Sequence, residues 1–433
     1  MKKNTMNTPD RTTQPPLKQI DSLSIGQPKT IVHSNGLTQH TFESNNHDAV
    51  RLDLIFKAGT AMQSKLLAAS TTNRMLKEGT TKHSGHHIAS RMDYHGAYID
   101  LTTTKDYCWA SLFALKKSIP RLLPLLAEMI KEPAFKPADF RILNSQQKQD
   151  FVVNSQKPKH MARQLFNEMI FGAETPYGQS ATVSDFDKLS RSDLAEFHSR
   201  FYNHRNATLI LAGAIDESVQ KAVNDHFSDE WGSAGIAQTV MQQSVQATGE
   251  HWTEKPGSLQ SAIQMGKLAM KRNHPDFAGF IMLNTVLGGY FGSRLMSNIR
   301  EDKGYTYGIY SQIAPFEHDA YFTIATEVGR EVTRAALDEI HYEINKLRTE
   351  AIPYDELQLV RNYLTGSYLR GLDGPYNQSE KFRSILGIPQ GMDYFTQTLQ
   401  TIQTVTADEL LVLAKRYLDP ESMLTIVVGE KIS

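Results

Sequence analysis

Two stretches of the chain, half its length apart, repeat one pattern of residues. Residues 194–213 read LAEFHSRFYNHRNATLILAG, and residues 410–429 read LLVLAKRYLDPESMLTIVVG. They align without a gap at an offset of 216, which pairs Leu194 with Leu410 and Gly213 with Gly429. In each copy a helical pattern leads into a short β-type run that ends at glycine. The repeat therefore predicts two homologous halves and restricts the fold to one that the chain can build twice.

Local signals in each half predict the same mixture of elements. Ser190 or Ser192 in one copy and Thr406 in the other are good N-cap residues for the repeated helix. Apolar patterning further predicts strands at 51–57 and 261–267 and helices at 64–76 and 274–287. We expect an α+β fold of two α/β-sandwich halves, each a largely antiparallel sheet covered by helices.

Changes in composition along the 433 residues suggest where the halves begin and end. Residues 1–20 are polar and contain three prolines, which is typical of a disordered arm. Residues 231–260 have no clear periodicity and are rich in Gly, Gln and Ser, as in a linker. We therefore expect an N-terminal half at 21–230, a linker at 231–260 and a C-terminal half at 261–433.

Charge and cysteine content exclude several classes of protein. The formal net charge is −1, whereas an obligatory nucleic-acid partner normally requires a basic surplus. Cys108 is the only cysteine, so there is no intrachain disulfide and no thiolate cage for a metal. No apolar run is long enough to span a bilayer, and no signal-peptide core follows Met1. These features favour a soluble, cytoplasmic protein with no membrane partner.

Six short segments occur in an order that resembles a known family. They are NGL at 35–37, KAGT at 57–60, RMLKEGT at 74–80, GAYIDLTTTKDY at 96–107, TPYG at 175–178 and GSRLMSNIREDKGYTY at 292–307. Together they resemble the pitrilysin or insulinase-type zinc metallopeptidases, which include mitochondrial processing peptidase, and in particular the short bacterial members. The resemblance covers nearly all of residues 30–431 and implies a peptidase homologue built from two such halves.

The zinc motif of that family is degenerate in this chain. Active members carry His-x-x-Glu-His just before a Gly-Thr pair, with two histidines on one helix face as ligands and the glutamate as general base. Counting back from the Gly-Thr pair at 79–80, these places fall on Ser70, Asn73 and Arg74, so a positive charge stands where the metal would bind. The later glutamate ligand of the family would fall near Asp150. We therefore expect no metal and no other cofactor in this chain.

A group of histidines is an alternative place for a metal. His83, His86 and His87 have i,i+3 and i,i+4 spacings, and His95 follows nearby. No carboxylate lies between them to act as a base. The simpler interpretation is that Ser84 caps a helix whose first turn is solvated and rich in histidine, and a chance metal site stays open as the second interpretation.

The second half retains a different family motif. Arg300 is expected at the end of a helix and Tyr307 on the following strand, after Gly304 at the turn. In relatives, an arginine and a tyrosine at this spacing reach the substrate near the scissile bond, where donors of this kind stabilise an oxyanion. An arginine that complements the helix dipole and tyrosines that simply occupy a strand are the structural alternative.

The segment at 97–107 is a second candidate for substrate binding. The resemblance implies an edge strand that pairs with extended peptide, with Ala97, Asp100, Thr102 and Thr103 as the candidate contacts. A plain sheet edge protected by Lys105 is an equally good interpretation. The glycines at 288, 289 and 292 lack the spacing of a nucleotide-binding loop.

These observations lead to two functional hypotheses of different classes. In the first, the chain is a non-catalytic subunit of a heterodimeric zinc peptidase, inactive alone, whose homologous partner carries the zinc motif. In the second, it is a peptide-binding or scaffold homodimer with no proteolytic role. An independent hydrolase with an unfamiliar site is a remote third possibility.

Overall fold

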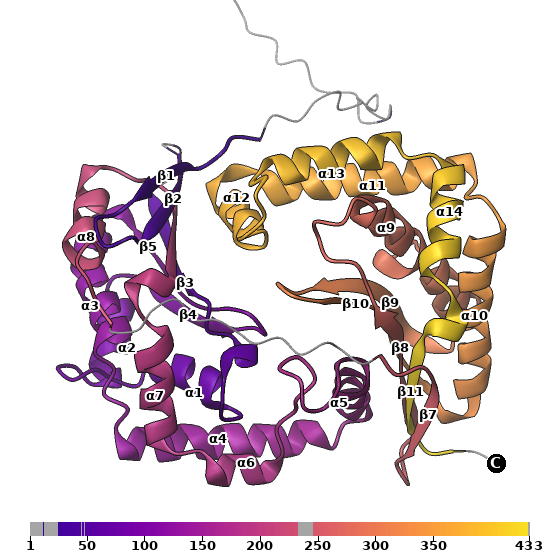
Figure 1. Ribbon diagram of the computed structural model, residues 1–433, viewed down its shortest axis with the longest axis horizontal. Coiled ribbons are helices and arrows are strands. Elements are labelled where there is room, and N and C mark those ends of the chain that lie inside the picture. Colours follow the sequence, from indigo (N-terminus) through magenta and orange to yellow (C-terminus); the bar gives the residue numbers. More distant parts are fainter. Residues whose placement is uncertain (1–11, 13–24, 45, 47, 233–245, 432–433) are drawn as a thin grey trace, which may run out of the picture.

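A computed structural model describes residues 12, 25–44, 46, 48–232 and 246–431, and it contains two mixed β-sheets, each covered by helices (Figure 1). The strands of the first sheet are β1 (Lys29–Val32), β2 (Thr38–Glu43), β3 (Ala49–Phe56), β4 (Tyr98–Thr103), β5 (Cys108–Leu115) and β6 (Ala207–Gly213). Those of the second are β7 (Gly249–Glu254), β8 (Gln260–Leu268), β9 (Thr306–Pro315), β10 (Ala320–Gly329) and β11 (Leu424–Gly429).

The two sheets have the same topology. The first has the order β1-β2-β6-β3-β5-β4 and the second the order β7-β11-β8-β10-β9. Each contains one parallel pair, β2 with β6 and β7 with β11, and all other pairs are antiparallel. Apart from the extra edge strand β1, the sheets match strand for strand. The expected fold of two duplicated, largely antiparallel halves is confirmed.

Helices α1 to α8 belong to the N-terminal half, and helices α9 to α14 belong to the C-terminal half. Those of the N-terminal half are α1 (Ala68–Met75), α2 (Gly85–Tyr94), α3 (Ile119–Lys131), α4 (Pro137–Ser155), α5 (Pro158–Phe171), α6 (Val183–Lys188), α7 (Arg191–Phe201) and α8 (Glu217–Phe227). Those of the C-terminal half are α9 (Phe277–Asn284), α10 (Thr333–Thr349), α11 (Tyr354–Leu372), α12 (Gly374–Arg383), α13 (Asp393–Thr404) and α14 (Ala407–Tyr417). None of the helices in the described part of the chain is long and apolar enough to cross a membrane.

The repeat found in the sequence recurs in the structure at the same offset. Helix α7 and helix α14 begin and end 216 residues apart (407 − 191 and 417 − 201). Both begin with a capping box: the Ser190 hydroxyl accepts from the Asp193 backbone, and the Thr406 hydroxyl accepts from the Glu409 backbone. Of the two serines considered as N-cap, Ser190 is therefore the cap.

Each sheet is covered on one face by a helix from the other half. On the second sheet, α5 packs against β8 and β11, where Phe166 and Ile170 contact Ile426 and its neighbours. On the first sheet, α12 packs against β2 and β6, where Phe382 joins a cluster with Phe42 and other buried side chains. Figure 1 shows α5 beside the second sheet and α12 beside the first. The two halves are thus held together by reciprocal packing of one helix each.

Three expectations change in detail. Residues 249–254, which the sequence placed in a linker, form β7, an edge strand whose polar side chains hide its periodicity. The helix expected at 64–76 begins only at Ala68, because Leu67 has a left-handed backbone (φ 72°). The helix expected at 274–287 is α9 continued by a π-helical segment, η4 (Thr285–Gly289). The arm expected at 1–20, apart from Thr12, and residues 233–245 lie outside the described residues.

Candidate functional site

Asn73, at the place of the family's glutamate, is a buried structural residue. Its side-chain amide is 1% exposed and donates to the carbonyl of Thr102 (2.8 Å) and to the hydroxyl of Thr103 (3.2 Å). Its side-chain oxygen accepts from the hydroxyl of Tyr202 (3.2 Å), which is itself buried. Asn73 therefore fastens α1 to the edge strand β4 and has no polar atom left over for a metal.

The remaining positions of the motif do not fit a zinc ion either. Ser70 donates to the carbonyl of Leu67 within its own turn, and Arg74 is exposed on the outer side of α1. Asp150 is exposed on α4, and the α4 side chain that contacts α1 is Gln147, which accepts from Thr71 (3.4 Å). Zinc sites in proteins use imidazole, thiolate or carboxylate ligands, none of which this part of α1 provides.

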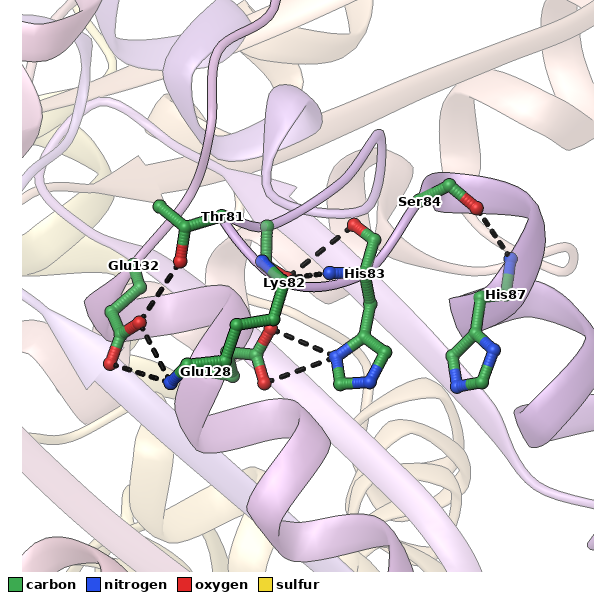
Figure 2. A network of polar contacts seen from close by, with 8 residues as sticks. Thr81, Lys82, His83, Ser84, His87, Glu128 and Glu132 are labelled. Carbon is green, nitrogen blue, oxygen red and sulfur yellow. Dashed lines mark hydrogen bonds and ion pairs between the residues drawn. The ribbon is translucent and has the colours of Figure 1, made fainter.

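The histidine-rich segment is built around a side-chain contact between His83 and Glu128 and a helix cap, as Figure 2 shows. The ring of His83 is 3.0 Å from the carboxylate of Glu128 on α3, and it stacks on the ring of His87. The hydroxyl of Ser84 accepts from the backbone N–H of His87, which is the expected cap. Burial alone would raise the pKa of Glu128, but hydrogen bonds from Thr80 and His83 outweigh it and lower that pKa.

These histidines do not converge on one point. His86 and His87 are exposed, and His95 lies at the other end of α2. Throughout residues 25–44, 48–232 and 246–431, no three His, Cys, Asp or Glu side chains are close enough to hold a metal ion. A solvated first turn next to the His83–Glu128 contact accounts for the arrangement.

The candidate peptide-binding segment forms β4, which is the outermost strand of the first sheet. Ala97 is buried just before the strand, and Asp100 is exposed with its carboxylate accepting from the Thr102 hydroxyl (2.9 Å). The carbonyl of Thr102 is already bonded to Asn73. The amide that replaces the family's glutamate therefore contacts the backbone of this strand near its C-terminal end.

The structure brings Arg300 and Tyr307 into contact. Arg300 lies in the π-helical segment η5 (Met296–Asp302), and Gly304, with a left-handed φ of 68°, turns the chain into β9. The guanidinium lies 4.7 Å from the ring centroid of Phe291 and 5.4 Å from that of Tyr307. Phe291 and Tyr307 are 62% and 93% exposed. The cation is thus held between two exposed aromatic rings.

Comparison with known proteins assigns the chain to a family. Residues 41–180 match the family model described as insulinase (peptidase family M16), and residues 188–364 match the model described as peptidase M16 inactive domain. The chain belongs to the insulinase family. The resemblance of the six sequence segments is confirmed at this level.

Individual relatives of this insulinase-family chain are distant. It is 22% identical over 357 residues to a protein named uncharacterized zinc protease YmxG of Bacillus subtilis, which covers 82% of this chain and 86% of that protein. It is 22% identical over 400 residues to the protein named non-peptidase homolog YmxG of Helicobacter pylori, with 88% and 89% covered. The names show that the family includes chains described as peptidases and a chain described as lacking that activity.

Two solved structures share the fold. One, described as a peptidase M16 inactive domain from Pseudomonas fluorescens, superposes with a TM-score of 0.86 at 23% identity over 94% of this chain and 99% of that one. The other, described as a protease from Helicobacter pylori, superposes with a TM-score of 0.87 at 17% identity over 94% and 100%. At these identities the likeness concerns the fold alone.

Phe291 and Tyr307 also line a cavity of about 980 Å³ between α5 and the second sheet. No residue of α1 lines it, so in this insulinase-family chain the degenerate positions at 70–74 and the Arg300–Tyr307 pair belong to separate places in the fold. Phe291 was not predicted from the sequence, although its position between Gly289 and Gly292 marked it as a loop aromatic. Gln147 was not predicted either, because no local pattern gives a signal for it.

Proposed function

We propose that this chain is a non-catalytic subunit of a heterodimeric zinc metallopeptidase. A homologous partner would carry the zinc motif, and this chain would contribute Arg300 and Tyr307 to peptide binding. The observation that carries the proposal is an asymmetry between the halves. The positions Ser70, Asn73 and Arg74 lack ligands, whereas the Arg300 guanidinium is preorganised between two exposed rings.

The chemistry of the pair suits a peptide carbonyl. Arg300 has no acidic partner among the described residues, so its donors are free for a ligand. Stacking on Phe291 and Tyr307 restricts the guanidinium, which reduces the entropy lost when it binds. Donors held in place in this way stabilise the negative charge that develops on a carbonyl oxygen during attack.

The β4 edge is the second element of the proposal. An extended peptide would pair with the exposed backbone near Asp100, where the sheet ends. The hydroxyl of Thr103 accepts from Asn73, which fastens the C-terminal end of the strand to α1. Backbone pairing of this type gives affinity with little sequence selectivity, which fits a subunit that positions substrate for a partner.

The test is co-expression with a homologous chain that carries an intact His-x-x-Glu-His motif. The pair should co-purify and cleave a quenched fluorescent peptide. Arg300→Ala and Tyr307→Phe should each reduce turnover by about 10²-fold, the usual effect of removing one oxyanion donor, without weakening association. Arg370→Ala and Tyr342→Phe, which change exposed residues of α11 and α10, serve as matched controls.

Four other results would contradict the proposal. Absence of association, or unchanged turnover in both variants, would remove the helper role. Stable self-association of the purified chain with no heteromeric partner would favour the alternative, a peptide-binding or scaffold homodimer. Peptide cleavage by the purified chain in the presence of a chelator would point to an independent hydrolase.

A further inference from the structure

The cavity between α5 and the second sheet has an unusual balance of charge. Its lining includes Lys157, Lys159 and Arg163 from the start of α5, together with His160. Among the described residues of the lining, the only carboxylate belongs to Glu327, which lies at a bulge between β10 and β9. The chain as a whole has a net charge of −1, so this concentration of cations is a local feature.

Arg300 adds a further cation at the rim of the same cavity. Its guanidinium stacks on Phe291 and Tyr307, and both of these rings line the cavity. On the opposite side, the ammonium of Lys159 lies 6.0 Å from the ring centroid of Tyr310 on β9. Cations of α5 therefore line the cavity, and the cation of η5 lies beside two of its aromatic rings.

The stability of the fold does not account for the cations on α5. Lys159 is in the first helical turn, where the helix dipole disfavours positive charge, and that turn contains no acidic residue. Lys159 and Arg163 are like charges at i,i+4 spacing, which also disfavours the helix. Neither forms an ion pair within the described residues. Arrangements that cost folding energy in this way are typical of binding sites.

The uncharged part of the lining can bind peptide groups. Gln260 and Gln264 lie on β8 and Gln312 lies on β9, and all three line the cavity. Each primary amide offers both a donor and an acceptor, as a peptide group does. A phosphate ligand would match only the donors, so the amides favour peptide over phosphate.

We infer that this cavity binds acidic peptide segments, whose carboxylates are held by Lys159 and Arg163 and whose backbone contacts the glutamine amides. The inference rests on the proposed peptide-binding function and names the chemical class of the peptide. The positive charge of the cavity selects the ligand. The cavity lies beside Arg300 and Tyr307, which are the residues proposed to reach the scissile bond.

The test measures binding of a labelled peptide containing a run of glutamates to the full chain by fluorescence anisotropy. A peptide of the same length with glutamine in place of glutamate is the neutral comparison. The acidic peptide should bind about tenfold more tightly, and raising the salt concentration should remove most of the difference. The double variant Lys159→Gln, Arg163→Gln should bind both peptides equally weakly.

The matched control is the double variant Lys29→Gln, Lys221→Gln, which loses the same charge from β1 and α8, outside the cavity. It should bind the acidic peptide as the unchanged chain does. The inference would be overturned if the two peptides bound equally or if neither bound. It would also be overturned if the Lys159/Arg163 double variant bound the acidic peptide as tightly as the unchanged chain. Displacement of the acidic peptide by tripolyphosphate at equal charge concentration would overturn it as well, because the cavity would then select any polyanion. The assay needs no partner and no turnover, so its failure is distinguishable from failure of the subunit hypothesis.

Discussion

The guanidinium of Arg383, on α12 of the C-terminal half, donates to the carboxylate of Asp53, on β3 of the N-terminal half, at 2.9 Å. Asp53 is fully buried, and its other oxygen accepts from Arg51 at 3.0 Å. Arg51 in turn bonds Glu380, one turn before Arg383 on α12. The second oxygen of this buried carboxylate therefore has its partner only when α12 is docked on the first sheet.

Replacing Asp53 by asparagine should destabilise the protein by about 3–5 kcal/mol, because two guanidinium groups would lose a buried counter-charge. The measurement is the shift of the urea unfolding midpoint at unchanged slope. The control Asp225→Asn breaks the exposed pair with Lys221 and should cost less than about 1 kcal/mol. Equal losses in the two variants would mean that the cluster does not hold α12.

Stability should fall on mild acidification because of His40. This residue of β2 packs edge-on against Phe382 of α12, and burial lowers the pKa of its imidazole to about 4. The unfolded chain takes up a proton at His40 near pH 6.5 and the folded chain only near pH 4, so stability decreases as pH falls between these values. Allowing for its partial exposure, we expect a loss of about 1–2 kcal/mol. His40→Gln should flatten the stability profile over this range, and an unchanged profile would contradict the assignment.

Asn73→Asp should destabilise the protein although the two side chains have nearly the same shape. The amide nitrogen of Asn73 donates to the Thr102 carbonyl, and a carboxylate would place an acceptor against that acceptor in a buried site. We expect a cost of about 3 kcal/mol in urea unfolding. Asn345→Asp, on the exposed face of α10, is the matched change and should have little effect.

The isolated chain should bind no stoichiometric zinc on α1. Ser70 and Arg74 offer no imidazole, and the amide of Asn73 is engaged with β4. Metal analysis of the purified chain should give much less than one zinc per molecule, and a chelator should leave its thermal midpoint unchanged. Stoichiometric zinc that is lost on substitution of α1 residues would overturn the proposed role as a helper subunit.

Features carried by neighbouring residues were predictable from the sequence. The repeat at an offset of 216 led to the twin helices α7 and α14 with their capping boxes, and apolar patterning located β3 and β8. Strand β7 was missed because an edge strand can be polar on both faces, which removes the alternation that identifies a strand. The sequence also indicated that the positions at 70–74 lack metal ligands, since ligand chemistry depends on residue type.

The sequence by itself thus determined the duplication, the order of elements within each half and the degenerate motif, because capping, patterning and ligand type act over short distances along the chain. Only the tertiary structure decided that α5 and α12 each cover the sheet of the other half, and that Asn73 is an anchor for β4. Asp53 and Arg383 lie 330 residues apart, and no local pattern encodes their contact. The physical reason is that burial and charge pairing depend on which surfaces meet in space, and those surfaces exist only after both halves have folded.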